Sequence, residues 1–194
     1  MILSSCNLAV AATGDDAGRI GNSSGGTAAP ALACPSLQPM VGVALLVSDG
    51  AAGGPQERSA QGIVIACAPV TIGSPSTTGS ATTIMVMGNG GAGFAPAHST
   101  GFTNCPPGAV ISGLAVHSGQ FDSAFIDATI TCAMLNTAPQ IVGVSDVYIV
   151  GSLTEPLNPN GATCPVGEIA SGFVPRIGAG LDSLEMSCAV PTCS

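Results

Sequence analysis

A histidine, a serine and an aspartate lie close together around residue 118, and these residue types could catalyse hydrolysis. His117, Ser118 and Asp122 would supply the imidazole, hydroxyl and carboxylate of a catalytic triad. Their spacing corresponds to no triad arrangement that we can identify, and no oxyanion-hole motif accompanies them. We therefore expect His117 to be a solvated turn residue, and we predict no catalytic residue here.

Two glycine-rich motifs could also carry chemistry. Gly21-Asn-Ser-Ser-Gly25 fits the G-x-S-x-G nucleophile elbow, but Gly26–Pro30 follows where a helix would have to begin. Gly88–Gly93 fits the dinucleotide pattern G-x-G-x-x-G, but Pro96 follows it and no acidic residue appears before Asp122. Both motifs indicate glycine-rich connections, so the sequence predicts that the protein is not an enzyme.

Three aspartates, Asp122, Asp127 and Asp182, lie at or just beyond predicted turns. Such carboxylates can support the turn by bonding to the backbone, accept hydrogen bonds from sugar hydroxyls, or coordinate calcium together with backbone carbonyls. The structural role is favoured, sugar binding comes second and calcium third. We predict no cofactor and no resident metal.

The chain has eight cysteines, an even number, and no C-x-x-C pair. Its only histidines are His98 and His117, so a zinc site is poorly supplied with ligands and disulfides are favoured. Disulfides form in oxidising compartments. The sequence therefore predicts an extracellular or cell-surface protein. Asn22-Ser-Ser24 is a glycosylation sequon, which matters only for a eukaryotic source.

Three repeated units suggest how the cysteines pair. Each unit begins Cys-Pro, has an apolar segment with a central glycine (Gly42, Gly113 or Gly172), then a polar turn and a second apolar segment ending in cysteine. The β-branched, alternating segments predict a hairpin per unit. Cysteines at the open end of a hairpin face each other, which predicts the bonds 34–67, 105–132 and 164–188.

The two remaining cysteines, Cys6 and Cys193, are predicted to join the ends of the chain. Leu3-Ser-Ser-Cys6 also resembles the cleavage box of bacterial lipoproteins. Lipidation of Cys6 would leave Cys193 without a partner, so the terminal disulfide is preferred.

The repeats imply an all-β fold. A further strand is expected before each hairpin, at Asn7–Ala12, Thr82–Met87 and Val144–Val150, and a short strand in each connector brings the total to about four per repeat. Three four-stranded antiparallel sheets around one core form a β-prism. We predict a single disulfide-stapled β-prism-like domain over residues 1–194, with repeats at about 7–70, 71–135 and 136–193.

Three short segments, Gly88–Phe94, Ser118–Asp122 and Gly178–Asp182, resemble the jacalin-type lectin domain. The resemblance implies a β-prism and, if sugar is bound, a site at the hairpin tips. The candidates for that site are Asp182 and Gly178, followed by Asp122 and Gly119. The Cys-Pro-x-Gly…Cys units are also similar to repeat modules of bacterial secreted proteins.

Charge is scarce in this sequence. Only 7% of the residues are charged, the net charge is −8, and no charged residue occurs between residues 59 and 121. Three cations are too few to bind nucleic acid, and 46% hydrophobic residues exclude disorder. No apolar run approaches the roughly 18 residues of a transmembrane helix.

The uncharged stretch suggests a surface buried against other copies of the chain, because burying unpaired charge in an interface is costly. The sequence thus predicts a non-enzymatic structural or adhesive subunit that assembles into a fibre or lattice. The alternative is a lectin-like carbohydrate-binding module, with a glycan as the partner.

Overall fold

The computed structural model describes residues 5–10, 15–21, 26–48, 59–88, 98–118, 125–149, 159–178 and 180–194. In these ranges the chain forms strands and one 3₁₀ turn, η1 (Pro35–Leu37), with no α-helix. The strands are β1 (Cys6–Ala9), β2 (Asp15–Gly21), β3 (Thr27–Ala28), β4 (Leu32–Ala33), β5 (Met40–Ser48), β6 (Ser59–Cys67), β7 (Val70–Ile72), β8 (Thr77–Thr78), β9 (Thr82–Met87), β10 (His98–Ser99), β11 (Thr103–Asn104), β12 (Ala109–Ser118), β13 (Phe125–Leu135), β14 (Ile141–Ile149), β15 (Pro159–Thr163), β16 (Ile169–Ile177), β17 (Leu181–Ala189) and β18 (Thr192–Cys193).

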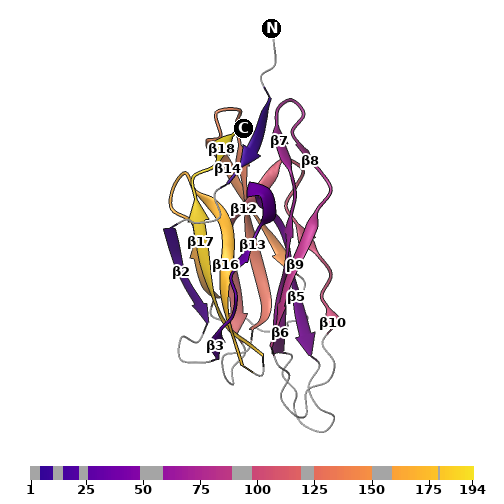
Figure 1. The fold of residues 1–194 in the computed structure, drawn as a ribbon, viewed down its shortest axis with the longest axis vertical. Coiled ribbons are helices and arrows are strands. Elements are labelled where there is room, and N and C mark those ends of the chain that lie inside the picture. Colours follow the sequence, from indigo (N-terminus) through magenta and orange to yellow (C-terminus); the bar gives the residue numbers. More distant parts are fainter. Residues whose placement is uncertain are drawn as a thin grey trace.

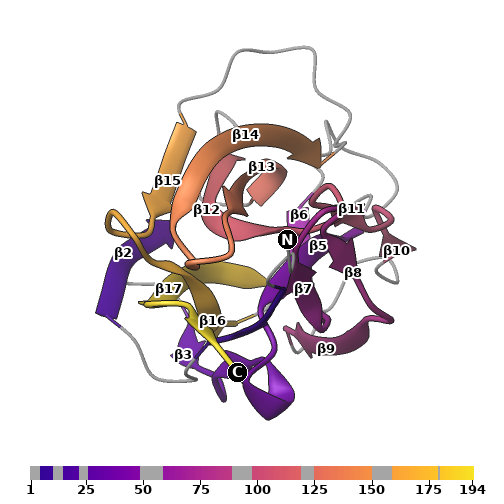
Figure 2. The ribbon, with the colours of Figure 1, turned by 90° about the horizontal axis from the view of Figure 1, so that it is seen from above.

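Three long antiparallel hairpins, β5–β6, β12–β13 and β16–β17, form the body of the molecule (Figure 1). A third strand pairs with the second strand of each hairpin: β9 with β6, β14 with β13 and β2 with β17. Short strands pair on the other side, namely β10 and β11 with β5, β15 with β12, and β3 and β4 with β16. The three sheets surround a common centre (Figure 2), which confirms the predicted all-β, β-prism-like fold.

The outer strands are distributed differently from the sequence-based expectation. The strand that precedes a hairpin in the chain pairs with the hairpin before it, so β9 extends β5–β6 and β14 extends β12–β13. Strand β18 follows β17 but pairs with β1, and β2, β3 and β4 from the beginning of the chain complete the sheet of the last hairpin. The sheets therefore cut across the proposed repeat ranges.

A fourth small sheet, ordered β18-β1-β7-β8, closes the end of the molecule where both termini lie (Figure 1). The expected strand at Asn7–Ala12 corresponds to β1, which pairs with β18 and β7 instead of joining the first hairpin. Leu8, Val70 and Ile72 of this sheet pack with Val110 and Ile169 in a buried cluster separate from the central core. This sheet gives the hairpin ends an apolar cover.

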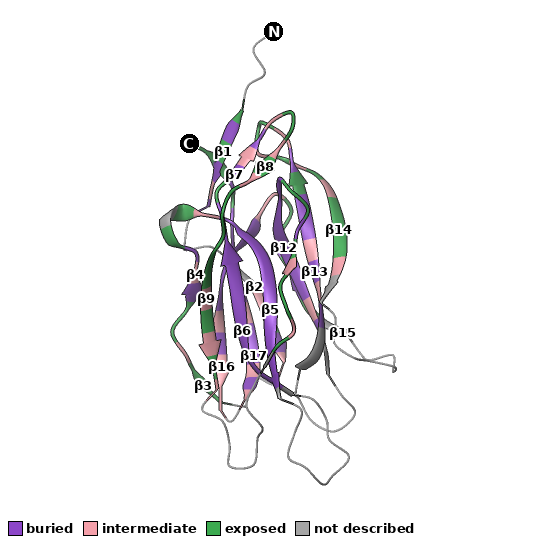
Figure 3. Ribbon diagram, turned by 90° about the vertical axis from the view of Figure 1, so that its right-hand side faces the viewer, coloured by how far each residue is buried: buried purple, intermediate pink, exposed green. Residues whose placement is uncertain are grey.

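Burial accounts for much of the uncharged stretch. Every residue from Ala60 to Ala68 is buried, and so are most residues from Cys105 to Val116 (Figure 3). Charge is excluded from such strands because an unpaired buried charge is costly. Between residues 59 and 121, strand β9 is the long strand that exposes much of its surface. The absence of charge therefore does not by itself require an interface between copies.

The central glycine of each Cys-Pro unit lies just past a β-bulge, where the register shifts between Met40 and Gly42, Ile111 and Gly113, and Ala170 and Gly172. An outer strand approaches each of these glycines. An added β-carbon would lie 2.6 Å from the Leu32 carbonyl oxygen of β4 at Gly172 and 3.3 Å from Thr163 Oγ1 of β15 at Gly113. Glycine is thus required where a neighbouring strand passes close to the bulge.

All eight cysteines form disulfides, and the pairs are those expected from the repeats: Cys6–Cys193, Cys34–Cys67, Cys105–Cys132 and Cys164–Cys188. Their Cα–Cα distances of 5.2 to 5.6 Å lie in the usual range for disulfides. Three bonds close the open ends of the hairpins, and the fourth ties β1 to β18. The disulfides and the hairpin tips therefore lie at opposite ends of the hairpins.

Candidate functional site

The tip of the β16–β17 hairpin carries a carboxylate in an unusual environment. Ile177 pairs with Leu181 and Arg176 with Ser183, so Asp182 is the extra residue of a β-bulge. Its Oδ2 atom is buried and has no hydrogen-bond partner in the described part of the chain. Buried polar atoms are nearly always hydrogen-bonded in native proteins, so this oxygen requires a structural or functional explanation.

Two glycines flank this carboxylate oxygen. A β-carbon added at Gly178 would lie 3.0 Å from Asp182 Oδ2, and one added at Gly26 would collide with it. Gly26 also has a φ of 58°, in the left-handed region that favours glycine. The carboxylate therefore lies against two glycines, one from the hairpin and the other from the segment before β3.

Neighbouring groups hold the tip from both sides. Within the turn, the Gly178 N–H donates to the Gly180 carbonyl at 2.9 Å. A β-carbon added at Gly180 would lie 2.9 Å from the Ala60 carbonyl oxygen and 3.4 Å from Gln61 Nε2, so the turn packs against the first hairpin. On the other side, Arg176 Nη2 donates to the Gly26 carbonyl at 2.8 Å.

The acidic residue at this bulge is specific to the third hairpin. A bulge occurs at the same place in the other two hairpins, where the extra residues are Gln61 and Ile126. Asp127 pairs with His117 and therefore corresponds to Ser183, which pairs with Arg176, while Asp182 corresponds to Ile126.

The structure brings two of the four predicted sugar-site residues together, Asp182 and Gly178. The other two, Asp122 and Gly119, lie outside the described residues. The side chains of His117, Ser118 and Asp127 are also outside the description. The sequence analysis did not identify Gly26 or Arg176 as part of this site. The glycine pair that ends at Gly26 could have indicated the first, and the scarcity of cations could have drawn attention to the second.

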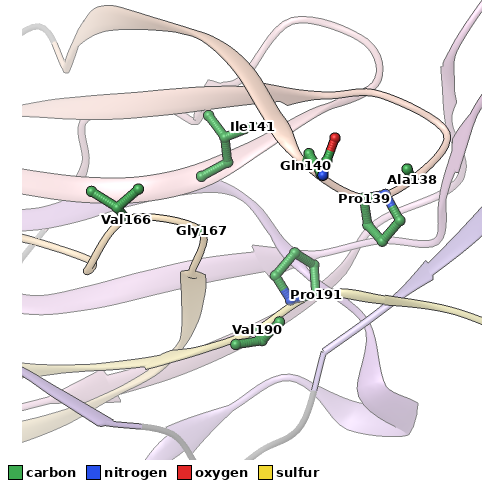
Figure 4. Close-up of a pocket in the computed structure, with 8 residues that line it drawn as sticks. All are labelled: Ala138, Pro139, Gln140, Ile141, Val166, Gly167, Val190 and Pro191. Carbon is green, nitrogen blue, oxygen red and sulfur yellow. The ribbon is translucent and has the colours of Figure 1, made fainter.

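A hollow lies at the disulfide end of the molecule, away from the Asp182 tip. This groove has a volume of about 460 Å³ and is bounded by the β13–β14 loop, the turn before β16 and the segment after β17. Figure 4 shows its walls, which are Ala138, Pro139, Gln140, Ile141, Val166, Gly167, Val190 and Pro191. None of these residues is charged.

Neither a metal centre nor a membrane-spanning helix is found in the described residues. No group of three or more His, Cys, Asp or Glu side chains there is arranged to hold a metal ion. In the same part of the chain, no helix could cross a lipid bilayer.

No protein-family model matches this sequence, and no curated protein sequence matches it. The resemblance to bacterial Cys-Pro-x-Gly repeat modules therefore stays a prediction.

Solved lectin structures are similar to the fold over nearly its whole length. Calystegia sepium agglutinin matches with a TM-score of 0.58 and 18% identity, covering 92% of this chain and 97% of that one. Calsepa lectin in complex with a biantennary N-glycan gives 0.56 and 18%, with coverages of 91% and 97%. A mannose-binding jacalin-related lectin from Ananas comosus gives 0.50 and 11%, with coverages of 93% and 99%. At these identities the likeness shows the fold alone, and this chain has the β-prism fold of jacalin-related lectins.

Proposed function

We propose that this protein is a carbohydrate-binding module whose site is the tip of the β16–β17 hairpin. The observation that carries the proposal is the half-buried Asp182 side chain at the hairpin tip, which has one oxygen without a partner and lies beside Gly26 and Gly178. A carboxylate accepts strong hydrogen bonds from hydroxyl groups, and glycines let a ligand approach the backbone closely. The lectin structures on the same fold support this proposal, and one of them holds a biantennary N-glycan.

The four disulfides are compatible with secretion, and we place the protein outside the cell, where glycan ligands are exposed.

The test is a glycan array with purified wild-type protein, followed by titration of the best ligand against Asp182→Ala. Hydrogen bonds to a charged group contribute about 1.5–3 kcal/mol, so affinity should fall about 10- to 100-fold. The melting temperature should stay nearly the same, because Asp182 Oδ2 has no partner to lose.

The matched control is Asp146→Ala on β14, a carboxylate that accepts a hydrogen bond from Thr131 and is remote from the tip. This variant should bind like the wild type. Wild-type protein that is silent across a broad array, or an Asp182→Ala variant that binds normally, would contradict the proposal.

We also propose, as a second candidate, that copies associate through strand β9. It is an edge strand in its sheet, and its exposed residues Thr82, Thr83, Met85 and Met87 are uncharged. Met85 and Met87 are 57% and 43% exposed. Uncharged edge strands favour pairing between molecules, and natural proteins usually block them with charge.

Thr83→Lys places a charge on this edge and should shift sedimentation towards the monomer while the melting temperature stays within a few degrees of wild type. Ser80→Lys, at an exposed position outside β9, is the control. Native protein that sediments as a compact monomer at high concentration would rule out assembly through β9.

A further inference from the structure

Arg176 forms one of the long-range contacts between the beginning of the chain and the candidate site. Its Nη2 donates to the Gly26 carbonyl at 2.8 Å, across 150 residues of sequence. The chain contains only three cations, and in the described part Arg19 forms a surface ion pair with Glu185 on the same sheet. One of the three cations of the protein, Arg176, therefore lies beside the candidate site.

Gly26 depends on such an anchor. Residues 26 to 28 are all exposed, and the strand that follows Gly26, β3, is two residues long. Its backbone pairs with Arg176 and Ile177, and beyond it the Ala29 N–H donates to the Pro175 carbonyl at 2.9 Å. An edge this short has low intrinsic stability, so the charge-assisted bond from Arg176 is a major restraint on it.

Gly26, which accepts the hydrogen bond from Arg176, lies directly against the Asp182 carboxylate. A β-carbon on Gly26 would meet Asp182 Oδ2 as well as the Ile177 carbonyl, at 2.7 to 2.8 Å from the latter's atoms. The position of Gly26 thus determines how Asp182 is covered, and how much of its carboxylate a ligand meets.

We propose that Arg176 is a positioning residue of the glycan site. It holds Gly26 against Asp182, so that Gly26 completes the site. The proposal rests on the proposed function. Arg176 acts through the Gly26 backbone and not by contact with the sugar. A guanidinium suits this task, because its planar set of donors is charged at all relevant pH values and loses little freedom when it bonds.

The experiment compares Arg176→Met, which keeps the aliphatic stem but removes the donors, with Arg176→Lys, which keeps a charged donor. Arg19→Met is the matched control, because it removes a cation from the same sheet without touching Gly26. Two quantities are measured on the full chain: affinity for the best array glycan, and amide hydrogen exchange at Gly26 and Ala29 without ligand.

We expect Arg176→Met to weaken glycan binding about tenfold and to speed exchange at Gly26 and Ala29 several-fold, with the melting temperature within a few degrees of wild type. Arg176→Lys should keep most of the glycan affinity and most of the protection from exchange. Arg19→Met should change neither the affinity nor the exchange rates. Binding lost with normal exchange would mean that Arg176 contacts the ligand, and faster exchange with normal binding would mean that the anchor does not serve the site. Either result overturns the inference.

The two proposals fail in different ways. If wild-type protein binds no glycan, the proposed function is wrong and this inference falls with it. If wild type binds, Asp182→Ala does not, and Arg176→Met binds normally, the glycan site stands and the positioning role alone is wrong.

Discussion

Replacing Gly172 with alanine is expected to destabilise the protein by about 3 kcal/mol, the upper part of the range for overpacking a well-packed site. The added β-carbon would lie 2.6 Å from the Leu32 carbonyl oxygen and 3.4 Å from the Ala33 Cα. Both atoms belong to the backbone of β4, so relief requires the strand to move away from β16. Denaturant unfolding of the disulfide-intact protein gives the free energy of unfolding that checks this value.

Two further glycine variants provide reference values for the change in unfolding free energy. Gly113→Ala has the same place in its own hairpin, but its nearest contacts are the side chains of Thr131 and Thr163 at 3.1 to 3.3 Å, so its cost should be smaller. Gly79→Ala has no contact closer than 3.5 Å and should change stability little. A Gly172→Ala protein as stable as Gly79→Ala would show that β4 does not pack against the bulge as described.

Removing the terminal disulfide, by Cys6→Ala with Cys193→Ala, is expected to cost about 5 kcal/mol of unfolding free energy. In the chain-entropy account the cost grows with the length of the loop that the bond closes, and these cysteines are 187 residues apart. The same account gives roughly 3.5 kcal/mol for the pair Cys164→Ala with Cys188→Ala, 24 residues apart. Denaturant titration of the two double variants compares the costs directly.

The order of these two costs is the informative result. If losing the terminal bond costs less than losing Cys164–Cys188, then the packing of β1 and β18 holds the ends together without it. Non-reducing peptide mapping is the companion measurement. A bond found between two different Cys-Pro units would contradict the hairpin pairing, and a lipid on Cys6 would contradict the terminal bond alone.

The features that depend on neighbours along the chain could be predicted from the sequence. Alternating β-branched segments interrupted by glycine and proline predicted strands, and the repeated Cys-Pro units predicted three hairpins. Cysteines at the open ends of the hairpins then predicted pairings such as Cys105–Cys132, which the structure has. These inferences succeed because the two strands of a hairpin are joined by a short turn, so their pairing is a local event.

Function was less well predicted, and for a physical reason. The lack of charge between residues 59 and 121 suggested a surface for self-assembly, but an uncharged strand can also be buried within its own molecule. Only the burial of β6 and β12 distinguishes the two cases. Asp182 and Gly178 were predicted as sugar-site residues because their segment resembles a lectin domain. Sugar binding was nevertheless the alternative, and self-assembly was the main prediction.

Three features depend on long-range packing and are seen in the tertiary structure alone. They are the pairing of each outer strand with its hairpin, the residue at each bulge, and the surroundings of Asp182. Strands β2 to β4 complete the sheet of the last hairpin, and this brings Gly26 and its anchor Arg176 to the carboxylate. Any of the exposed hairpin edges offers similar backbone hydrogen bonds to an incoming strand. The choice among them is made by packing of the whole core around its centre, which no local pattern encodes.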